Sequence, residues 1–322
     1  MWPISIDQIE RLQIEITTYC NAACPSCERA KYEVGPIYKR HLNSIEMSLE
    51  NIKKWLPLED MKSLMVIHLC GNIDEPTLHP EIFEICQWLE QYASVHVSTN
   101  GGTKNKKFWE KMASLKNTLV IFGIDGLEDT NHIYRKNVRW QKLKENYTTF
   151  IEHGGKASWQ FIIFEHNKHQ QKIAEERSVQ EGFKSFVTVY STRENHEVEA
   201  VGKEREKNSC IKCKATYDND DLGYVSLFVD VRGNIWPCCW MGSSDISNYD
   251  IAPKLNFGNF LSHNLKYDTF EDIISGDMFA YLWENLHQFD VCNQHCKENK
   301  TDTITWTGKW VDEMRKVKNY DL

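Results

Sequence analysis

Segments that would mark a membrane, secreted or repeat protein are missing from this 322-residue sequence. No apolar run approaches the length of about 18 residues that a membrane-spanning helix needs. The first residues, Met1 to Asp7, have neither a basic start nor an apolar stretch, so a secretory signal is not evident. No internal repeat or low-complexity tract is present. These absences predict a soluble, cytoplasmic protein with no membrane partner.

Positive charge is also scarce. The 38 Lys and Arg residues are outnumbered by 46 Asp and Glu, which leaves a formal net charge of -8. A negative chain has no general attraction to phosphate backbones, so a nucleic-acid partner is not expected. The hydrophobic content of 41% and charged content of 26% are those of an ordinary globular protein. The length suits one large domain with a smaller one.

The most informative motif follows the strand-like run Leu12–Thr17. Cys20, Cys24 and Cys27 have C-x3-C-x2-C spacing, and three thiolates can hold three irons of a cubane four-iron cluster with the fourth iron open. One alternative is a buried helix face, but Pro25 inside a helix would cost about 3 kcal/mol. Another is structural zinc, but no fourth cysteine or close histidine completes four ligands. The spacing therefore favours an iron–sulfur cluster.

Short apolar or β-branched runs alternate with amphipathic segments through residue 190. The strands are expected at Leu12–Thr17, Ser63–Cys70, Val95–Thr99, Leu119–Ile124, Ser158–Phe164 and Phe186–Tyr190. The helices are expected at Ser48–Leu56, Pro80–Gln91, Asn105–Leu115, Lys142–His153 and Gln170–Gly182, with a later one at Phe270–Leu286. Such an alternation predicts a parallel sheet, open or partly closed into a barrel, with functional groups at the carboxyl ends of its strands.

Polar motifs follow the next three predicted strands. They are Cys70–Pro80, Ser98–Gly101 and Gly123–Gly126, the last followed closely by Tyr134 and Arg135. Singly, each reads as a loop, because Gly, Pro, Asn and Asp favour turns. Taken with the cysteine motif, residues 10 to 190 resemble the radical S-adenosylmethionine (SAM) superfamily.

The resemblance implies a partial (β/α)6 TIM-like barrel over residues 1–192. It also implies that Cys20, Cys24 and Cys27 ligate a [4Fe-4S] cluster, and that SAM chelates the open iron. Reduction would cleave SAM to a 5′-deoxyadenosyl radical, which abstracts a hydrogen atom from the substrate. The implied SAM contacts are Gly71 with Glu75 or Asp74 at the ammonium, Ser98 and Asn100 at the ribose, and Arg135 at the carboxylate. Ser26 stands where the superfamily commonly has an aromatic residue, so Tyr19 is expected to stack on the adenine.

Three cysteine groups follow the charged stretch 193–208, which is expected to be a linker. Thiolates from three separate segments predict a small metal-clamped domain over 209–322, for which zinc and iron are both chemically suitable. The segment Val229–Gly233 before Cys238 resembles the SPASM or "twitch" auxiliary-cluster extension. This resemblance implies one auxiliary [4Fe-4S] cluster, with ligands Cys210, Cys213, Cys238 and Cys296 and with Cys292 as the alternative to Cys296.

Cys239 stands where the related sulfatase-maturing enzymes have a catalytic Asp. A thiol at this position could return a hydrogen atom to a substrate radical, as radical epimerases are understood to do. The alternative is a buried or cluster-ligating cysteine. Oxidation, epimerisation and rearrangement therefore stay open as reaction types.

The substrate is expected to be a small molecule or a peptide. The predicted barrel begins near residue 12, which leaves no room for a leader-binding domain and favours a small molecule. A flavodoxin or ferredoxin is the expected electron donor. A noncatalytic iron–sulfur or zinc protein and an RNA-modifying radical enzyme are the alternatives. The polar groups at successive strand ends favour catalysis, because a structural protein has no need of them.

Overall fold

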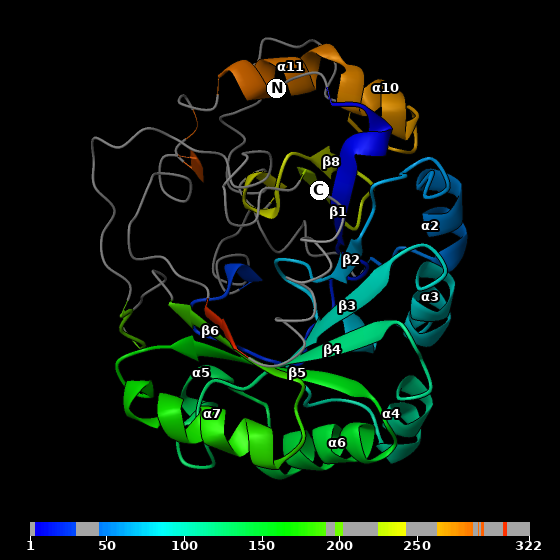
Figure 1. Cartoon of the computed structure of the whole chain (residues 1–322). Coiled ribbons are helices and arrows are strands. Elements are labelled where there is room, and N and C mark those ends of the chain that lie inside the picture. The colour runs from blue at the N-terminus through cyan, green and yellow to red at the C-terminus, as the bar shows by residue number, and fades with distance from the viewer. Residues whose placement is uncertain are drawn as a thin grey trace. The chain divides into compact units, whose positions relative to one another are not determined.

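The computed structural model describes residues 4–29, 45–190, 197–201, 225–242, 263–285, 289 and 291–292, and the backbone of Thr305–Thr307. Within these residues, strands and helices alternate along the chain (Figure 1). The strands are β1 (Ile9–Ile14), β2 (Val66–Leu69), β3 (Ser94–Thr99), β4 (Thr118–Gly123), β5 (Lys156–Ile163), β6 (Ser185–Tyr190), β7 (Val225–Val229), β8 (Ile235–Trp236) and β9 (Thr305–Thr307). The helices are α2 (Leu49–Trp55), α3 (Ile82–Leu89), α4 (Lys106–Met112), α5 (Asn131–Tyr134), α6 (Trp140–Glu152), α7 (Gln171–Gln180), α10 (Phe270–Ser275) and α11 (Asp277–Glu284). Short 3-10 turns form η1 (Ile6–Gln8), η3 (Pro76–Leu78) and η4 (Lys168–Gln170).

The chain divides into two compact units. The first unit comprises Met1–Tyr19, Lys31–Val95 and Arg205–Asn299. The second comprises Cys20–Ala30, His96–Glu204 and Lys300–Leu322.

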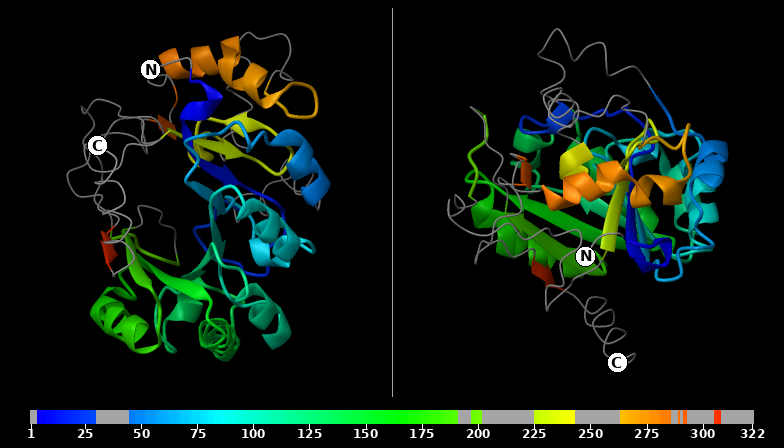
Figure 2. Two further views of the ribbon diagram at one scale, coloured as in Figure 1. Left: turned by 45° about the vertical axis from the view of Figure 1, so that its right-hand side comes forward. Right: turned by 90° about the horizontal axis from the view of Figure 1, so that it is seen from above.

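In the first unit, β1 lies between β7 and β2, and β8 follows at the far side of β7. Leu12 pairs in parallel with Ile67 of β2 and with Leu227 of β7, whereas β8 runs antiparallel to β7. Successive strand residues point to opposite faces of a sheet, so Leu12 and Ile14 share one face while Gln13 and Glu15 share the other. Over Leu12 to Glu15, this alternation gives one apolar face and one polar face. Helices α10 and α11 lie beside β7 and β8 (Figure 2).

In the second unit, β4, β5 and β6 pair in parallel, and β9 pairs antiparallel with β6. Trp109 of α4, Phe122 of β4 and Phe150 of α6 are almost completely buried. The ring centroid of Phe122 lies 5.3 Å from that of Trp109 and 6.0 Å from that of Phe150. Inclined aromatic pairs at these distances add to the stability gained from burial. This aromatic cluster holds α4 and α6 against β4.

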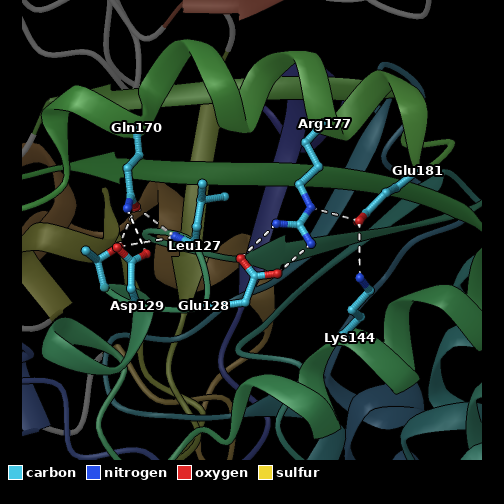
Figure 3. Close-up of polar contacts among 8 residues, drawn as sticks. Leu127, Glu128, Asp129, Lys144, Gln170, Arg177 and Glu181 are labelled. Atoms are coloured by element: carbon cyan, nitrogen blue, oxygen red, sulfur yellow. Dashed lines mark hydrogen bonds and ion pairs between the residues drawn. The ribbon is translucent and has the colours of Figure 1, made fainter.

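A polar network fastens α7 to the segment after β4 (Figure 3). The Oε1 atom of Gln170 accepts a hydrogen bond from the Leu127 amide at 2.9 Å. Arg177 forks onto the carboxylate of Glu128 with distances of 2.9 and 2.7 Å. These bonds restrain the chain that leads into α5 and Arg135.

The predicted alternation is confirmed, because each of the predicted strands and helices has a counterpart. The sequence did not predict α5, a single helical turn. The helix expected over Phe270–Leu286 is two helices, α10 and α11, because Gly276 between them has an extended backbone with φ -77° and ψ 164°.

The predicted linker, residues 193–208, is described only at 197–201. There the Glu199 carbonyl accepts a hydrogen bond from the Glu165 amide at 3.1 Å. Strand β7, which follows the predicted linker, pairs with β1. Across the described ranges, no helix has the length and apolar character needed to cross a membrane.

Candidate active site

The cysteine loop, Cys20–Cys27, is an irregular turn in the second unit. The Cys27 amide donates to the Cys24 carbonyl at 3.1 Å, which closes the turn around Pro25. Cys24 is 7% exposed, whereas Cys20 and Cys27 are half-buried. Because the loop is not helical, the three thiols do not form one buried helix face.

The three thiols of the cysteine loop are the donor type that an iron–sulfur cluster takes. A cubane binds each cysteine through a different iron, so three thiolates can hold three irons. The donor set therefore fits a four-iron cluster.

Asn100, the first residue after β3, contacts the cysteine loop. Its Nδ2 donates to Asn21 Oδ1 at 2.9 Å and lies 4.0 Å from Cys20 Sγ. Its Oδ1 accepts from the Gly102 amide at 2.8 Å. Ser98, half-buried and two residues earlier on β3, points to the same face of the strand. Asn100 thus orients the cysteine loop, and the predicted ribose contacts of Ser98 and Asn100 stay predictions.

Arg135 is held by a buried ion pair. Its Nε donates to Asp125 Oδ2 at 2.6 Å, and the Asp125 side chain is 0% exposed. The other carboxylate oxygen accepts from the Ile162 amide at 2.6 Å. The guanidinium also hydrogen-bonds to Cys24. A side chain at Gly123 would collide with Arg135, so the glycine at the end of β4 leaves room for it.

Burial dominates the electrostatics around this ion pair. It raises the pKa of the Cys24 thiol to about 11, and Arg135 opposes this shift. It also raises the pKa of Asp125, again opposed by Arg135. Burial works against the charge of Arg135, but Asp125 and Cys24 together hold its pKa above the ordinary value. The raised pKa of Asp125 argues for a neutral acid, whereas the raised pKa of Arg135 argues for a charged pair. The 2.6 Å contact between the carboxylate and the guanidinium favours the charged pair.

The acidic loop, Gly71–Glu75, follows β2 in the first unit and surrounds the carboxylate of Glu15. Glu15 comes directly after β1 and is 3% exposed. Its Oε1 accepts from the amides of Asn72 at 2.7 Å and Ile73 at 3.2 Å. A Cβ atom at Gly71 would collide with the Glu15 side chain. The loop therefore depends on a glycine here for close approach.

The two predicted ammonium ligands are placed differently. Asp74 Oδ1 accepts from the Gly71 amide at 2.8 Å, and the backbone of Ile16 is a second hydrogen-bond partner of this buried carboxyl group. Glu75 is 2% exposed and its Oε1 accepts from the Thr77 hydroxyl at 2.6 Å. The Glu75 amide donates to the carbonyl of Tyr19, whose side chain is 41% exposed. Asp74 thus bonds to backbone groups, whereas Glu75 bonds to the side chain of Thr77.

Burial raises the pKa of Glu15 to about 7, with a further contribution from Asp230, while the two loop amides oppose the rise. Burial and the neighbouring Glu15 raise the pKa of Asp74 well above its ordinary range. Desolvation and like charge both favour the neutral acid. Both carboxyl groups therefore hold their protons to a higher pH than exposed carboxyl groups do.

Cys239 lies beside the acidic loop in the same unit. Its carbonyl accepts from Asn72 Nδ2 at 2.9 Å. Cys238 and Cys239 are half-buried, and Cys292 is 4% exposed. The remaining auxiliary-cluster ligands, Cys210, Cys213 and Cys296, lie outside the described residues. The auxiliary ligand set stays a prediction.

Sequence reasoning missed the residues that hold the predicted ones in place. Glu15 positions the acidic loop, Asp125 fixes Arg135, and Asn21 pairs with Asn100. Glu15 and Asp125 are ionisable residues just after β1 and β4, and both are buried. A buried charge of this kind needs a partner, and that is the signal that could have identified them.

Comparison with known families supports the motif assignment. The Radical SAM superfamily matches residues 14–175, half of the chain. The 7,8-dihydro-6-hydroxymethylpterin dimethyltransferase of Methanocaldococcus jannaschii is 23% identical over 153 residues, which are 47% of this chain and 28% of that protein. The match thus spans less than a third of the length of that relative.

Solved structures share the fold. Streptococcus suis SuiB bound to S-adenosylmethionine has a TM-score of 0.60 and 14% identity, covering 84% of this chain and 66% of that one. SuiB bound to precursor peptide SuiA gives the same TM-score at 15% identity, with 88% and 67% covered. BtrN in complex with AdoMet and 2-DOIA has a TM-score of 0.52 and 15% identity, with 92% and 96% covered. The predicted partial-barrel α/β fold is confirmed.

Proposed function

This chain belongs to the Radical SAM superfamily, and from that premise we propose that it reductively cleaves S-adenosylmethionine and uses the resulting 5′-deoxyadenosyl radical to abstract a hydrogen atom from its substrate. One observation carries the proposal. Cys20, Cys24 and Cys27 stand on an irregular turn that is contacted by Asn100, directly after β3, and by Arg135, at the end of α5.

Each part of the site has a proposed task. The three thiolates would hold a [4Fe-4S] cluster, which with SAM supplies one-electron chemistry when bound. Loading must release protons, because burial raises the pKa of Cys24. Asp74, a buried carboxyl group of the acidic loop, would accept the cofactor ammonium. Tyr19, Ser98 and Glu75 are proposed to complete the cofactor contacts.

The proposed net reaction is balanced by an external electron donor, such as a flavodoxin or ferredoxin. One electron and SAM convert a substrate C–H group into a carbon radical, with methionine and 5′-deoxyadenosine as products. The substrate is proposed to be a small molecule or a peptide. SuiB has been seen with a peptide and BtrN with 2-DOIA, so the shared fold is compatible with both.

Cys239 is the proposed hydrogen donor for an epimerisation. Its S–H bond would break as a new C–H bond forms on the substrate radical, and the thiyl radical left behind would need one electron from the external donor and one proton from solvent. Support comes from the hydrogen bond between its carbonyl and Asn72 of the acidic loop. One solvent deuterium in an inverted product would support this role, whereas an oxidised product without deuterium would exclude it.

The auxiliary [4Fe-4S] cluster is a separate proposal, with the ligands Cys210, Cys213, Cys238 and either Cys296 or Cys292. Iron analysis of the reconstituted protein tests it. Two clusters give roughly eight irons per chain and a single cluster roughly four. If the second cluster is present, Cys213→Ala should lower the iron content from roughly eight to roughly four per chain.

The deciding experiment is anaerobic reconstitution followed by SAM and dithionite, with 5′-deoxyadenosine measured by mass spectrometry. We expect 5′-deoxyadenosine from the wild-type protein and none from Cys24→Ala. Cys86→Ala is the matched control, because Cys86 is a buried cysteine of helix α3 and does not belong to the cysteine loop. If wild-type protein with a verified reducible cluster forms no 5′-deoxyadenosine, even when candidate substrates are present, an electron-transfer function would be favoured.

A further inference from the structure

We propose that Glu15 is a positioning residue for SAM: its buried carboxylate holds the acidic loop in the shape that presents Asp74 to the cofactor ammonium. This inference rests on the proposed function and adds to it a residue that contacts neither cluster nor cofactor. It follows from the contacts of Glu15 with the loop.

The backbone of Glu15 is fixed by the sheet. Its amide donates to the Val229 carbonyl at 2.9 Å, which extends the pairing of β1 with β7 by one residue. The side chain must then leave the strand on the polar face shared with Gln13. Glu15 thus enters the acidic loop from a rigid support, and a functional group is placed more accurately on a strand than on a loop.

The side chain of Glu15 accepts two consecutive amides of the loop. One oxygen, Oε1, receives the Asn72 and Ile73 amides at 2.7 and 3.2 Å. Two successive N–H groups that point at one oxygen fix the local backbone conformation. The next residue, Asp74, closes the turn by accepting from the Gly71 amide. The orientation of Asp74 therefore depends on the turn that Glu15 holds.

Gly71 shows how closely loop and carboxylate fit. A Cβ atom at this position would occupy the space of the Glu15 carboxyl group. Only glycine permits this approach without displacement of the side chain. Gly71 and Glu15 thus form one unit, and changes at the two positions should not be additive.

The hydrogen-bond donors near the end of β7 do not depend on Glu15, because a neighbouring acid, Asp230, accepts from them. Asp230, at the end of β7, accepts from the Arg232 amide at 2.8 Å, from Asn234 Nδ2 at 2.8 Å and from Trp236 Nε1 at 3.1 Å. These partners belong to the turn after β7 and to β8, which follows it. The hydrogen bonds that Glu15 Oε1 accepts from the Asn72 and Ile73 amides, in contrast, come from the acidic loop.

The test uses cluster-loaded Glu15→Ala and Glu15→Gln, with Glu50→Ala as a control that removes an exposed carboxylate from the same unit. Two buried amides lose their acceptor in Glu15→Ala, so we expect SAM affinity to fall roughly tenfold to a hundredfold while iron content stays at the wild-type level. Glu15→Gln keeps an acceptor oxygen and should remain within about threefold. Equilibrium dialysis with radiolabelled SAM measures these affinities.

Hydrogen–deuterium exchange of the acidic loop provides a readout that does not depend on SAM. The amides of Asn72 and Ile73 should exchange faster in Glu15→Ala than in the wild type or Glu15→Gln. Wild-type SAM affinity in folded, cluster-loaded Glu15→Ala, or unchanged exchange of these two amides, would overturn the inference and leave the proposed function standing. If the wild-type protein binds no SAM, the proposed function is wrong and this inference falls with it.

Gly71→Ala covers the case in which Glu15→Ala does not fold. The added methyl group should push Glu15 off the loop amides, so SAM affinity should fall as in Glu15→Ala. In the double variant, the two losses should overlap instead of adding. Fully additive losses would show that Gly71 and Glu15 act independently and would contradict the inference.

Discussion

The acidic loop of the first unit and the cysteine loop of the second unit each depend on a carboxylate buried at the end of a strand, but the two carboxylates are stabilised differently. Asp125 faces a guanidinium at 2.6 Å. Glu15 faces two backbone amides and has Asp230 and Asp74 as acidic neighbours. Partial charges on amides offset less of the desolvation cost than a full cation does. An ion pair therefore stabilises the cysteine-loop region, whereas the acidic-loop region can change its protonation near neutral pH.

Removal of a cluster ligand is the largest expected effect, and it separates the two regions by function. Cys24→Ala should eliminate both the cluster absorbance and 5′-deoxyadenosine formation, because the remaining two thiols cannot complete the cluster. The acidic loop is not touched by this change, so its amide exchange should stay at the wild-type rate. A Cys24→Ala protein that still makes 5′-deoxyadenosine would contradict the assignment of the cysteine loop.

Loss of charge at Asp125 comes next. Asp125→Asn leaves Arg135 buried without its counter-ion, and breaking a buried pair costs about 3 kcal/mol or more of unfolding free energy. Anaerobic urea denaturation measures the loss. Asp129→Asn is the control from the same segment, because Asp129 is exposed and accepts a hydrogen bond from Gln170; it should cost under about 1 kcal/mol. Equal costs for the two variants would show that the ion pair with Arg135 is not the stabilising feature.

The pH dependence of stability tests the other half of the comparison. Burial raises the pKa of Glu15 from 4.5 to about 7, so the folded state holds a proton that the unfolded state has released between these values. The stabilisation is complete below about pH 4.5 and is lost as the pH rises through 7, by an amount on the order of 3 kcal/mol. Asp74 shifts in the same direction.

Glu15→Gln cannot release this proton, so its unfolding free energy should decline less between pH 5 and pH 8 than that of the wild type. Denaturation curves at several pH values measure the two slopes. Identical slopes would mean that Glu15 does not titrate in this window. Glu50→Ala should reproduce the wild-type slope, because the side chain of Glu50 is exposed.

The smallest effect is expected at the exposed network of α7, which sharpens the contrast with the buried ion pair. Arg177→Ala removes the fork onto Glu128 and the hydrogen bond to Glu181. Partly exposed pairs contribute about 0.2–1 kcal/mol, so stability should fall by no more than this. Thermal unfolding of Arg177→Ala and the wild type measures this loss of stability. A loss as large as that of Asp125→Asn would show that the α7 network holds the segment leading to Arg135 more tightly than expected.

The local sequence pattern was sufficient to predict most of the helices and strands, but some could not be predicted from it. The apolar runs of β1 to β6 and the amphipathic helices between them were recognisable, because period and length differ between strands and helices. The turn α5 is too short to show a period. The break between α10 and α11 was missed, because an isolated glycine does not by itself end a helical pattern. The pairing of β7 with β1 joins segments more than 200 residues apart and could not be read from either one.

By itself, the sequence determined the chemistry available to this protein: three thiols at cluster spacing, polar groups after successive strands, and a fold class that follows from alternation. The tertiary structure alone decided which of these groups meet. Glu15 holds the amides of Asn72 and Ile73, Arg135 takes Asp125 as its counter-ion, and Asn100 holds the cysteine loop. Donor type and local conformation are properties of neighbouring residues, whereas burial and choice of partner arise only when distant segments pack together.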